Sequence, residues 1–396
     1  MDAKVSIYDS CKDVPINEWE DLLTPNDVFL SIGFLSLIET YHKNEISPNY
    51  IVLKEKNKVI GILYSQTFKL SSRKLKEYIN HGNPGFNFIR LIKSQLANFV
   101  NLKVGFLGNL FLTNEMGFKI HPNYANKIDI NKVLSKLQGQ NHNKLILLPH
   151  FYKDNFEFSN HYFKEINVEP DMHLKIPKSW DSFEDYYDAI QSKYKKRYRK
   201  ILINSSSIKR KELNQSDIKQ YAPMLDKLFD KVYNKSSFNT AKFNTNIFSD
   251  LKQLIPNTSI VGYFIGDKMI GFSSNILLNN TMYAHFVGLD YEVNHKLDLY
   301  SRMLYDKIEY AIENKVELIK FGRTASEFKS NFGAMAQSNI GYVYDSSGIL
   351  LRILSPLLKL IKEKKWYQRN PFKEENKIKD ITSYESAASP KSKVLH

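Results

Sequence analysis

One short pattern occurs twice in this chain and limits how it can fold. Lys-Val-Ile-Gly at residues 58–61 is paralleled by Lys-Met-Ile-Gly at residues 268–271. Each copy follows a turn between two apolar runs, which predicts a β-hairpin. Later in the chain, the runs at 144–147 and 317–320 are also alike. A repeated order of hairpin, helix and strand predicts two copies of one α/β unit, and 396 residues suffice for two cores.

The repeat predicts how the chain is divided. We expect an N-terminal unit over residues 1–165 and a C-terminal unit over residues 166–348, each with a mixed sheet flanked by helices. Residues 349–372 are basic and amphipathic and contain a tryptophan. They predict a C-terminal helix that either packs against the second unit or lies on an anionic membrane surface. Residues 373–396 are polar and are predicted to be disordered.

Composition narrows the class of protein. The chain is 42% hydrophobic and 13% aromatic, as expected for a folded protein. A net charge of +14 favours anionic partners: nucleic acid, a phosphate-bearing cofactor or an acidic membrane surface. A single cysteine, Cys11, excludes an intramolecular disulfide and a thiolate metal cluster, and we expect no metal. Without a signal-peptide core or a long apolar stretch, we expect a cytoplasmic protein, peripheral at most to the inner membrane surface.

The most distinctive chemistry lies in residues 317–334. An apolar run predicts a short strand that ends at Gly322, and a short helix follows. This places Arg323 at the C-terminal end of a strand, where ligands collect in sheet-and-helix folds, and Lys329 on the next helix. The spacing by itself fits two solvated charges on an ordinary turn equally well.

The order of residues in this stretch resembles a known signature. Phe-Gly-Arg-Thr-Ala at 321–325 is followed by Glu-Phe-Lys at 327–329 and Phe-Gly-Ala at 332–334. This resembles the C-terminal end of the tandem acyltransferases related to the GNAT N-acetyltransferases. They comprise the group labelled BioF2-like and the FemABX peptidoglycan aminoacyltransferases. The resemblance implies two tandem GNAT-like units, transfer of an acyl group to an amine, and an active cleft at the second unit.

The resemblance also implies roles for individual side chains. Lys329 would neutralise charge near the donor carbonyl or phosphate, and Arg323 would clamp an anionic group of donor or acceptor. Transfer to an amine requires a proton acceptor, and His285, Asp290 and Glu115 are rival candidates that the sequence does not rank.

A segment of the first unit, residues 105–118, is rich in Gly and Asn and resembles the first-unit segment of the BioF2-like group. Asn109 and Glu115 in this segment are candidates for binding the acceptor amine, which is a small-molecule or lipid-linked compound in these families. A structural turn that needs glycine at positive φ explains the composition equally well.

The donor implied by the GNAT fold is acyl-CoA, such as acetyl-CoA. Its pyrophosphate would lie at the N-terminus of the helix after the strand at 281–290. His295, Lys296 and Tyr300, together with Arg199, are therefore candidate donor contacts. Residues 294–299 contain no glycine, unlike the usual GNAT phosphate loop. Aminoacyl-tRNA therefore remains an alternative donor.

A cluster of six cations lies within residues 193–200, on one long helix predicted to start near residue 182. The cluster either grips a phosphate backbone or is the solvated face of an amphipathic helix. Three functions follow. The first is an N-acyltransferase that uses acyl-CoA. The second is an aminoacyl-tRNA-dependent transferase acting on a cell-wall precursor. The third is a non-catalytic module that binds RNA or an anionic surface.

Overall fold

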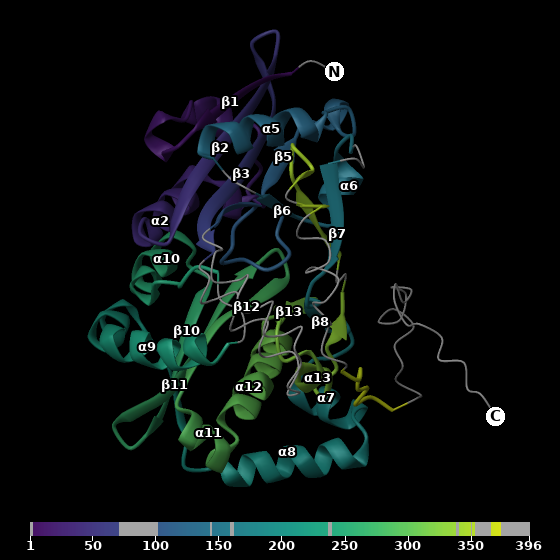
Figure 1. Ribbon diagram of the computed structural model, residues 1–396. Helices are drawn as coiled ribbons and strands as arrows, with labels where there is room; N and C mark the ends of the chain where they lie inside the picture. The colour runs from purple at the N-terminus through teal and green to yellow at the C-terminus, as the bar shows by residue number, and fades with distance from the viewer. Residues whose placement is uncertain are drawn as a thin grey trace, which may run out of the picture.

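The computed structural model of the chain describes residues 3–70, 102–142, 145–158, 162–236, 240–337, 340–349, 351–352 and 366–373. Two mixed sheets, each flanked by helices, lie one above the other in Figure 1. The predicted α/β class with two units is confirmed. The tail predicted to be disordered, residues 373–396, lies outside the described residues from residue 374 onward.

The first sheet has the order β1-β2-β3-β4-β6-β15-β7, and β5 pairs with β3. Its helices include α2, which packs on β2, and α5, which contacts β1 and β6. The elements of this part are β1 (Lys4–Tyr8), η1 (Cys11–Asp13), α1 (Ile16–Glu20), η2 (Val28–Leu30), α2 (Ile32–His42), β2 (Ile46–Glu55), β3 (Lys58–Leu70), β4 (Leu102–Leu107), β5 (Phe118–Ile120), η3 (Pro122–Tyr124), α5 (Ile130–Asn141), β6 (Leu145–Pro149), α6 (Tyr152–Asn155), β7 (Phe163–Asn167) and β15 (Ile340–Tyr344).

The second sheet has the order β14-β8-β13-β12-β11-β10-β9. Helix α9 packs on β11 and β12, and α12 packs on β12, α7 and α8. The elements of this part are β8 (Met172–Lys175), α7 (Phe183–Ala189), α8 (Ser192–Asn204), β9 (Lys209–Glu212), α9 (Gln215–Lys235), η5 (Thr245–Ile247), α10 (Phe248–Leu254), β10 (Thr258–Ile265), β11 (Lys268–Leu278), β12 (Thr281–Leu289), α11 (Tyr291–Leu297), α12 (Leu299–Glu313), β13 (Leu318–Lys320), α13 (Ser326–Ser330) and β14 (Met335–Ala336).

The two hairpins that revealed the repeat are alike in detail. In the first, Gly61 pairs with Leu53 and the register then shifts before the next pair. In the second, Gly271 pairs with Tyr263 and the register shifts at the same place. The later strands also correspond, because β6 runs parallel to β4 and β13 runs parallel to β12. The shared bulge and the shared parallel pair confirm that the units are two copies of one design.

One strand crosses between the sheets, which corrects the predicted boundary. Strand β15 was expected in the second unit, residues 166–348, but it pairs with β6 and β7 in the first sheet. Strand β8, at the start of the predicted second unit, lies in the second sheet as expected, between β13 and β14. The first sheet is therefore completed by a strand from the end of the second unit. Local sequence patterns predict strands but not their partners, so the crossing of β15 was not foreseen.

The units share one hydrophobic core, so they form a continuous body. A single cluster of buried side chains includes Phe34 and Tyr64 from the first unit and Leu228 and Phe272 from the second. At its edge, the ring of Phe29 meets that of Tyr283 edge-on, with centroids 5.0 Å apart. Such burial of aromatic surface fixes the units relative to one another.

The long helix predicted near residue 182 is in fact two helices, α7 and α8, with a break at Ile190 and Gln191. Segment 366–373 stabilises this break, because the Gln191 backbone N–H donates to the Pro371 carbonyl (2.8 Å) and not to a carbonyl of α7. The Gln191 side chain also donates to the Phe372 carbonyl (2.9 Å). Residues 366–372 are not helical, so the helix predicted over 349–372 is wrong for this part, and residues 353–365 lie outside the described range. In the described parts of the chain, none of the helices has the length and apolarity to cross a bilayer.

Candidate active site between the two units

Strands β12 and β13 separate near the junction of the two units. They pair only where residues 281–283 meet residues 318–320, and the rest of β12 continues without β13 beside it. After β13 the chain turns sharply at residues 321–325. Gly322, Thr324 and Ala325 all have positive φ, at 76°, 69° and 51°. This is strained backbone for Thr and Ala, and such strain persists only where surrounding contacts enforce it.

Lys329 is the side chain that enforces this turn. It is 4% exposed, and its ammonium group donates to the carbonyls of Phe321 (2.8 Å), Gly322 (3.0 Å) and Arg323 (2.7 Å). Burial lowers its pKa to about 8, while the nearby carboxylate charges of Asp171 and Glu169 oppose the shift. All three N–H donors are used. In this structure the ammonium group therefore has no N–H left over for a bond to an acyl donor.

The turn presents Arg323 at the end of β13. The buried Nε of Arg323 has no hydrogen-bond partner among the described residues. Burial lowers the pKa of the guanidinium, and the carboxylate charges of Asp171 and Glu169 oppose this. The first unit lies close by, since Thr113 Oγ1 would lie 3.5 Å from a Cβ placed on Gly322. A half-buried guanidinium whose Nε–H has no partner can bind an anionic group.

Polar side chains from three adjacent strands lie in a row beside this turn. Lys320 on β13 is opposite Tyr283 on β12 and opposite His173 on β8. Cross-strand partners share one face of a sheet, so the three side chains line the same face. The neighbouring residues Met282, Ile319 and Leu174 are fully buried in the core on the other face.

Glu115 comes to this row from the first unit. Its carboxylate forms an ion pair and a hydrogen bond with Lys320, whose ammonium group also lies 4.9 Å from the centre of the Tyr283 ring. Burial, followed by the charge of Glu115, raises the pKa of Tyr283. The structure thus brings Glu115 and Arg323 to one region, although Lys320 already holds the carboxylate of Glu115.

Asp171 and His173, which the sequence analysis missed, lie at the end of this row. His173 Nε2 is 2.7 Å from Asp171 Oδ2, and Asp171 is 2% exposed. The other carboxylate oxygen of Asp171 is buried without a hydrogen-bond partner in the described structure. The signal was present as Asp-Met-His at residues 171–173, because alternate residues of a strand point to the same side.

The other two base candidates lie in different surroundings. The His285 ring packs against Phe243 and Phe286, with centroids 5.1 and 4.3 Å away. Burial lowers the pKa of His285 to about 3, and the charge of Lys307 adds to the shift. Asp290 caps α11 by accepting from the Glu292 N–H (3.1 Å) and pairs with Lys231 (2.8 Å), which lowers its pKa. Asp290 is thus a helix cap and an ion-pair partner.

The Gly- and Asn-rich loop of the first unit is internally braced. Asn109 Oδ1 accepts from the Phe111 N–H (3.0 Å) and from the Gln66 side chain (3.2 Å). Gly108 has φ of 117° and is packed so closely on Gly117 that a Cβ on Gly117 would lie 2.4 Å from its Cα. The glycines are therefore required for the turn, and Asn109 holds the loop that carries Glu115.

The proposed donor contacts lie on α8, α11 and α12. His295 and Lys296 are exposed in the last turn of α11. The Tyr300 ring stacks on Phe328 of α13, with centroids 5.4 Å apart. Arg199 is exposed, and its Nε donates to the Tyr187 hydroxyl (2.9 Å).

The N-terminus of α12 is where the GNAT resemblance predicts the CoA pyrophosphate. Asp298 precedes the helix with φ of 53°, its side chain makes no capping hydrogen bond to the helix, and its carboxylate accepts from the Asn204 side chain (2.8 Å). The N–H of Tyr300 already donates to the side chain of Asn294 (2.7 Å). The neighbouring carboxylate and the used N–H donor both disfavour a pyrophosphate here.

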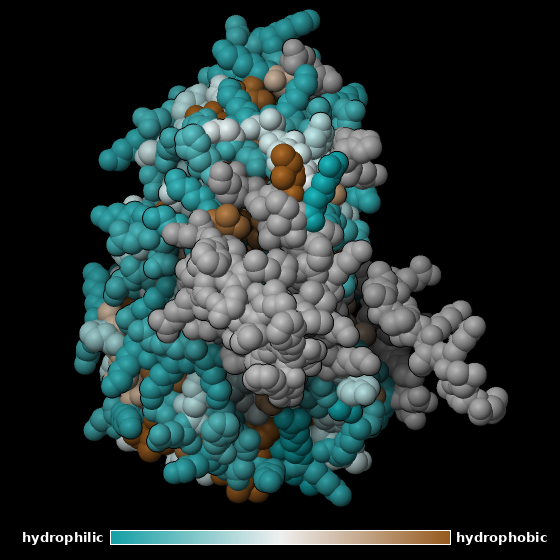
Figure 2. Space-filling view, in the orientation of Figure 1, coloured by the Kyte–Doolittle hydropathy of each residue, from teal (hydrophilic) through white to brown (hydrophobic). Residues whose placement is uncertain are grey.

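Helix α8 lies across the end of the molecule away from the first sheet (Figure 1). Part of its charge is used internally: Lys195 pairs with Asp188 (2.7 Å), and the Arg197 guanidinium lies 5.4 Å from the Phe328 ring centre. Lys196 and Lys200 are exposed. The described surface in this view is mostly hydrophilic (Figure 2).

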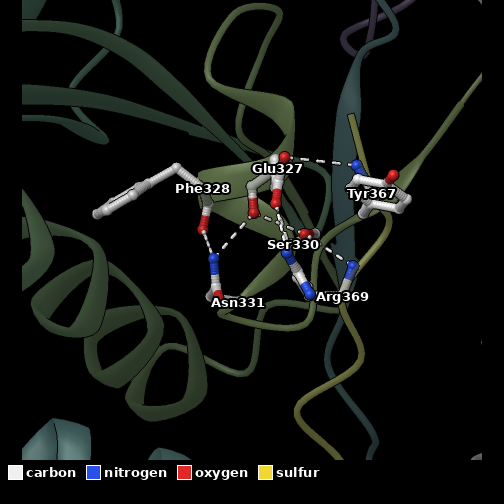
Figure 3. A network of polar contacts seen from close by, with 6 residues as sticks. All are labelled: Glu327, Phe328, Ser330, Asn331, Tyr367 and Arg369. Carbon is white, nitrogen blue, oxygen red and sulfur yellow. Dashed lines mark hydrogen bonds and ion pairs between the residues drawn. The ribbon is translucent and has the colours of Figure 1, made fainter. Parts of the chain in front are cut away.

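Helix α13 is fastened from outside by the C-terminal segment 366–373 (Figure 3). Glu327 accepts from the Arg369 guanidinium (2.7 Å), and the Arg369 N–H donates to Ser330 Oγ (3.0 Å). Phe372 is 4% exposed and packs against Trp180 and Tyr186. The segment thus connects α13 to the break between α7 and α8.

The repeated bulged hairpin, the parallel strand pair that separates and the helix after it define the class: the molecule has the fold of tandem GNAT proteins. Residues 225–330 match the acetyltransferase (GNAT) domain family. The second unit therefore contains a GNAT domain, which is an acyltransferase module.

Three solved structures illustrate the likeness. A tandem GNAT protein from the clavulanic acid biosynthesis pathway is 9% identical, with a TM-score of 0.50 over 87% of this chain and 98% of that one. FemX is 10% identical, with a TM-score of 0.48 over 89% and 100%. The C-terminal domain of a putative lysylphosphatidylglycerol synthetase from Agrobacterium fabrum is 8% identical, with a TM-score of 0.45 over 87% and 95%. A comparison with curated protein sequences gives no match.

Proposed function

We propose that the protein is an N-acyltransferase whose active site lies between the two units, at the end of β13. The Arg323 side chain is half-buried, and its buried Nε, which has no hydrogen-bond partner in the described structure, carries this proposal. It lies where β12 and β13 separate, in the matched GNAT domain, and opposite the loop that carries Glu115. Arg323 would hold an anionic group of the donor or acceptor by paired N–H donors.

In this proposal Lys329 positions rather than reacts. Its bonds to three carbonyls hold the strained turn and thereby aim Arg323. Lys320, next to Tyr283, is paired with Glu115, so the positive charge that remains for the reacting carbonyl is that of Arg323. Preorganised charge of this kind stabilises the developing oxyanion without reorganising during the reaction. Glu115, and Asn109 which braces its loop, would bring the first unit next to the acceptor amine.

Of the two donors, an aminoacyl ester carried by tRNA fits the structure better than acyl-CoA. The carboxylate of Asp298, the residue before α12, would repel an anion at this N-terminus, and the N–H of Tyr300 is already used. The exposed Lys196 and Lys200 of α8 offer contacts to a phosphate backbone instead. With such a donor the protein would act in the cytoplasm on a small-molecule or lipid-linked amine.

Calorimetric titration with acetyl-CoA and gel-shift titration with aminoacyl-tRNA test this proposal. Wild-type protein is expected to bind aminoacyl-tRNA and to bind acetyl-CoA weakly. Arg323→Gln is expected to weaken binding of the ligand that reaches the site by about 30- to 150-fold, equivalent to 2–3 kcal/mol for a lost charged hydrogen-bonding group.

Arg210→Gln is the matched control, because Arg210 pairs with Asp306 and Glu309 and lies on the edge strand β9, which β10 and β11 separate from β12 and β13. Equal affinities of the Arg323 variant and wild type for both ligands would contradict the proposal. If only a shallow, salt-dependent loss follows from each removed cation, a non-catalytic basic module explains the data better.

A further inference from the structure

Asp171 and His173 form a pair whose geometry suggests more than a structural contact. Asp171 directly precedes β8 and His173 lies within it. Both residues therefore belong to the backbone segment next to the turn that carries Arg323. This placement is fixed by two backbone hydrogen bonds: Phe321 N–H to Met172 O (2.8 Å) and Met172 N–H to Gly322 O (3.3 Å). The pair therefore cannot move independently of the turn.

The hydrogen bonding of the pair leaves one ring nitrogen available. Nε2 of His173 is 2.7 Å from Oδ2 of Asp171, so a neutral ring donates its proton there. Within the described residues, Nδ1 of His173 has no hydrogen-bond partner, and the side chain retains 11% of its exposure. A carboxylate that orients an imidazole and leaves its second nitrogen as an acceptor is the arrangement used for general bases.

The charges around the pair suit an amine. The second oxygen of Asp171 is buried and has no hydrogen-bond partner in the described structure, so Asp171 keeps negative charge beside the His173 ring. Lys320 lies on the neighbouring strand, but Glu115 pairs with it. The groups of the adjoining elements that bear on the pair are thus Lys320 and Tyr283 of the row, Glu115 of the first unit, and Arg323 and Lys329 of the turn.

We propose that His173, oriented by Asp171, is the general base that deprotonates the acceptor amine in the proposed acyl transfer. This rests on the proposed function and names the base that the sequence could not. The acceptor enters as an ammonium ion, and Nδ1 of His173 takes one proton. The free amine attacks the donor carbonyl carbon, a C–N bond forms, and the C–O bond to the carrier breaks. The leaving oxygen takes the proton from His173, and the nitrogen loses a further proton to water.

Acceptor amines of different basicity distinguish a general-base role of His173 from a purely structural role. Label transfer from alanyl-tRNA and from acetyl-CoA is measured with a primary alkylamine, which is an ammonium ion at pH 7, and with hydroxylamine, which is already neutral. His173→Gln is expected to reduce kcat with the alkylamine by about 100-fold or more, within the range for general-base catalysis, and to change the hydroxylamine rate little.

A second measurement needs no donor. Nitrogen chemical shifts of the His173 ring should show the proton on Nε2 in wild type, with loss of this preference in Asp171→Asn. Exposed His142, at the end of α5, gives the matched control His142→Asn, which should resemble wild type in every assay.

The outcomes are distinct. If wild type transfers to the alkylamine and His173→Gln does so equally fast, or loses both acceptors equally, the base assignment is wrong and the proposed function stands. If wild type transfers from neither donor to either acceptor, the proposed function fails, and the base assignment fails with it.

Discussion

Replacing Lys329 by Met removes the group that holds the active-site turn. The ammonium group makes three hydrogen bonds to backbone carbonyls, at 2.7 to 3.0 Å, from a side chain that is 4% exposed. Bonds from a charged donor contribute about 1.5–3 kcal/mol each, and the relieved burial of the charge offsets part of their loss. We therefore expect a net loss of about 3–5 kcal/mol in the free energy of unfolding, as when one partner of a buried charged contact is removed.

The pH dependence of this loss has a definite sign. The pKa of Lys329 is lowered to about 8 in the folded protein, against the ordinary value of 10.5. Between these values the unfolded chain binds more protons than the folded one, so stability from this group rises with pH. The rise is at most about 3 kcal/mol. Below pH 8 the ammonium is charged in both states and its contribution is constant.

Urea unfolding of wild type and Lys329→Met at pH 7.0, 8.5 and 9.5 measures both effects, with Lys315→Met as the control. Lys315 is exposed and pairs only with the exposed Asp181, so its loss should cost less than 1 kcal/mol. The difference between wild type and Lys329→Met should widen towards pH 9.5. A loss below 1 kcal/mol, or one independent of pH, would refute the positioning role of Lys329.

Three further outcomes follow from the structure. Phe372→Ala should destabilise the fold by about 3–5 kcal/mol in urea unfolding, because a buried ring is lost, whereas Arg369→Gln should cost less than about 1 kcal/mol. The ring of His285 should show no titration by nuclear magnetic resonance between pH 5 and 8, because burial lowers its pKa to about 3. Charge reversal of both Lys196 and Lys200 should weaken tRNA binding in a salt-dependent way and leave acetyl-CoA binding unchanged; unchanged tRNA affinity would exclude α8 as the contact.

The sequence predicted those features of the fold that local patterns encode. The hairpins near residues 58 and 268, the strand before Gly322 and the helix bearing Lys329 are all present, because apolar periodicity and turn residues specify them. The pairing of β15 with the first sheet was not predictable, because strand partners depend on contacts between distant residues.

The site was predicted in part. Only the family resemblance predicted that Arg323 and Glu115 serve one site. In the structure, Lys320 ends the strand before the Arg323 turn and pairs with Glu115, so both residues lie in one region. The contacts of Lys329 and Asp290 depend on which hydrogen-bonding and charged groups surround them in space. Sequence spacing does not show these neighbours. The pair Asp171 and His173 was visible as a polar alternation but was read only as a strand.

The central claim is that an acyl group is transferred to an amine between the two units. The most direct test is transfer of a labelled acyl group from aminoacyl-tRNA or acetyl-CoA to an amine, compared in wild type, Arg323→Gln and Arg210→Gln. We predict transfer by wild type and by Arg210→Gln, and a loss of about 30-fold or more in Arg323→Gln. Equal transfer by all three proteins, or none by wild type with either donor, would contradict the account.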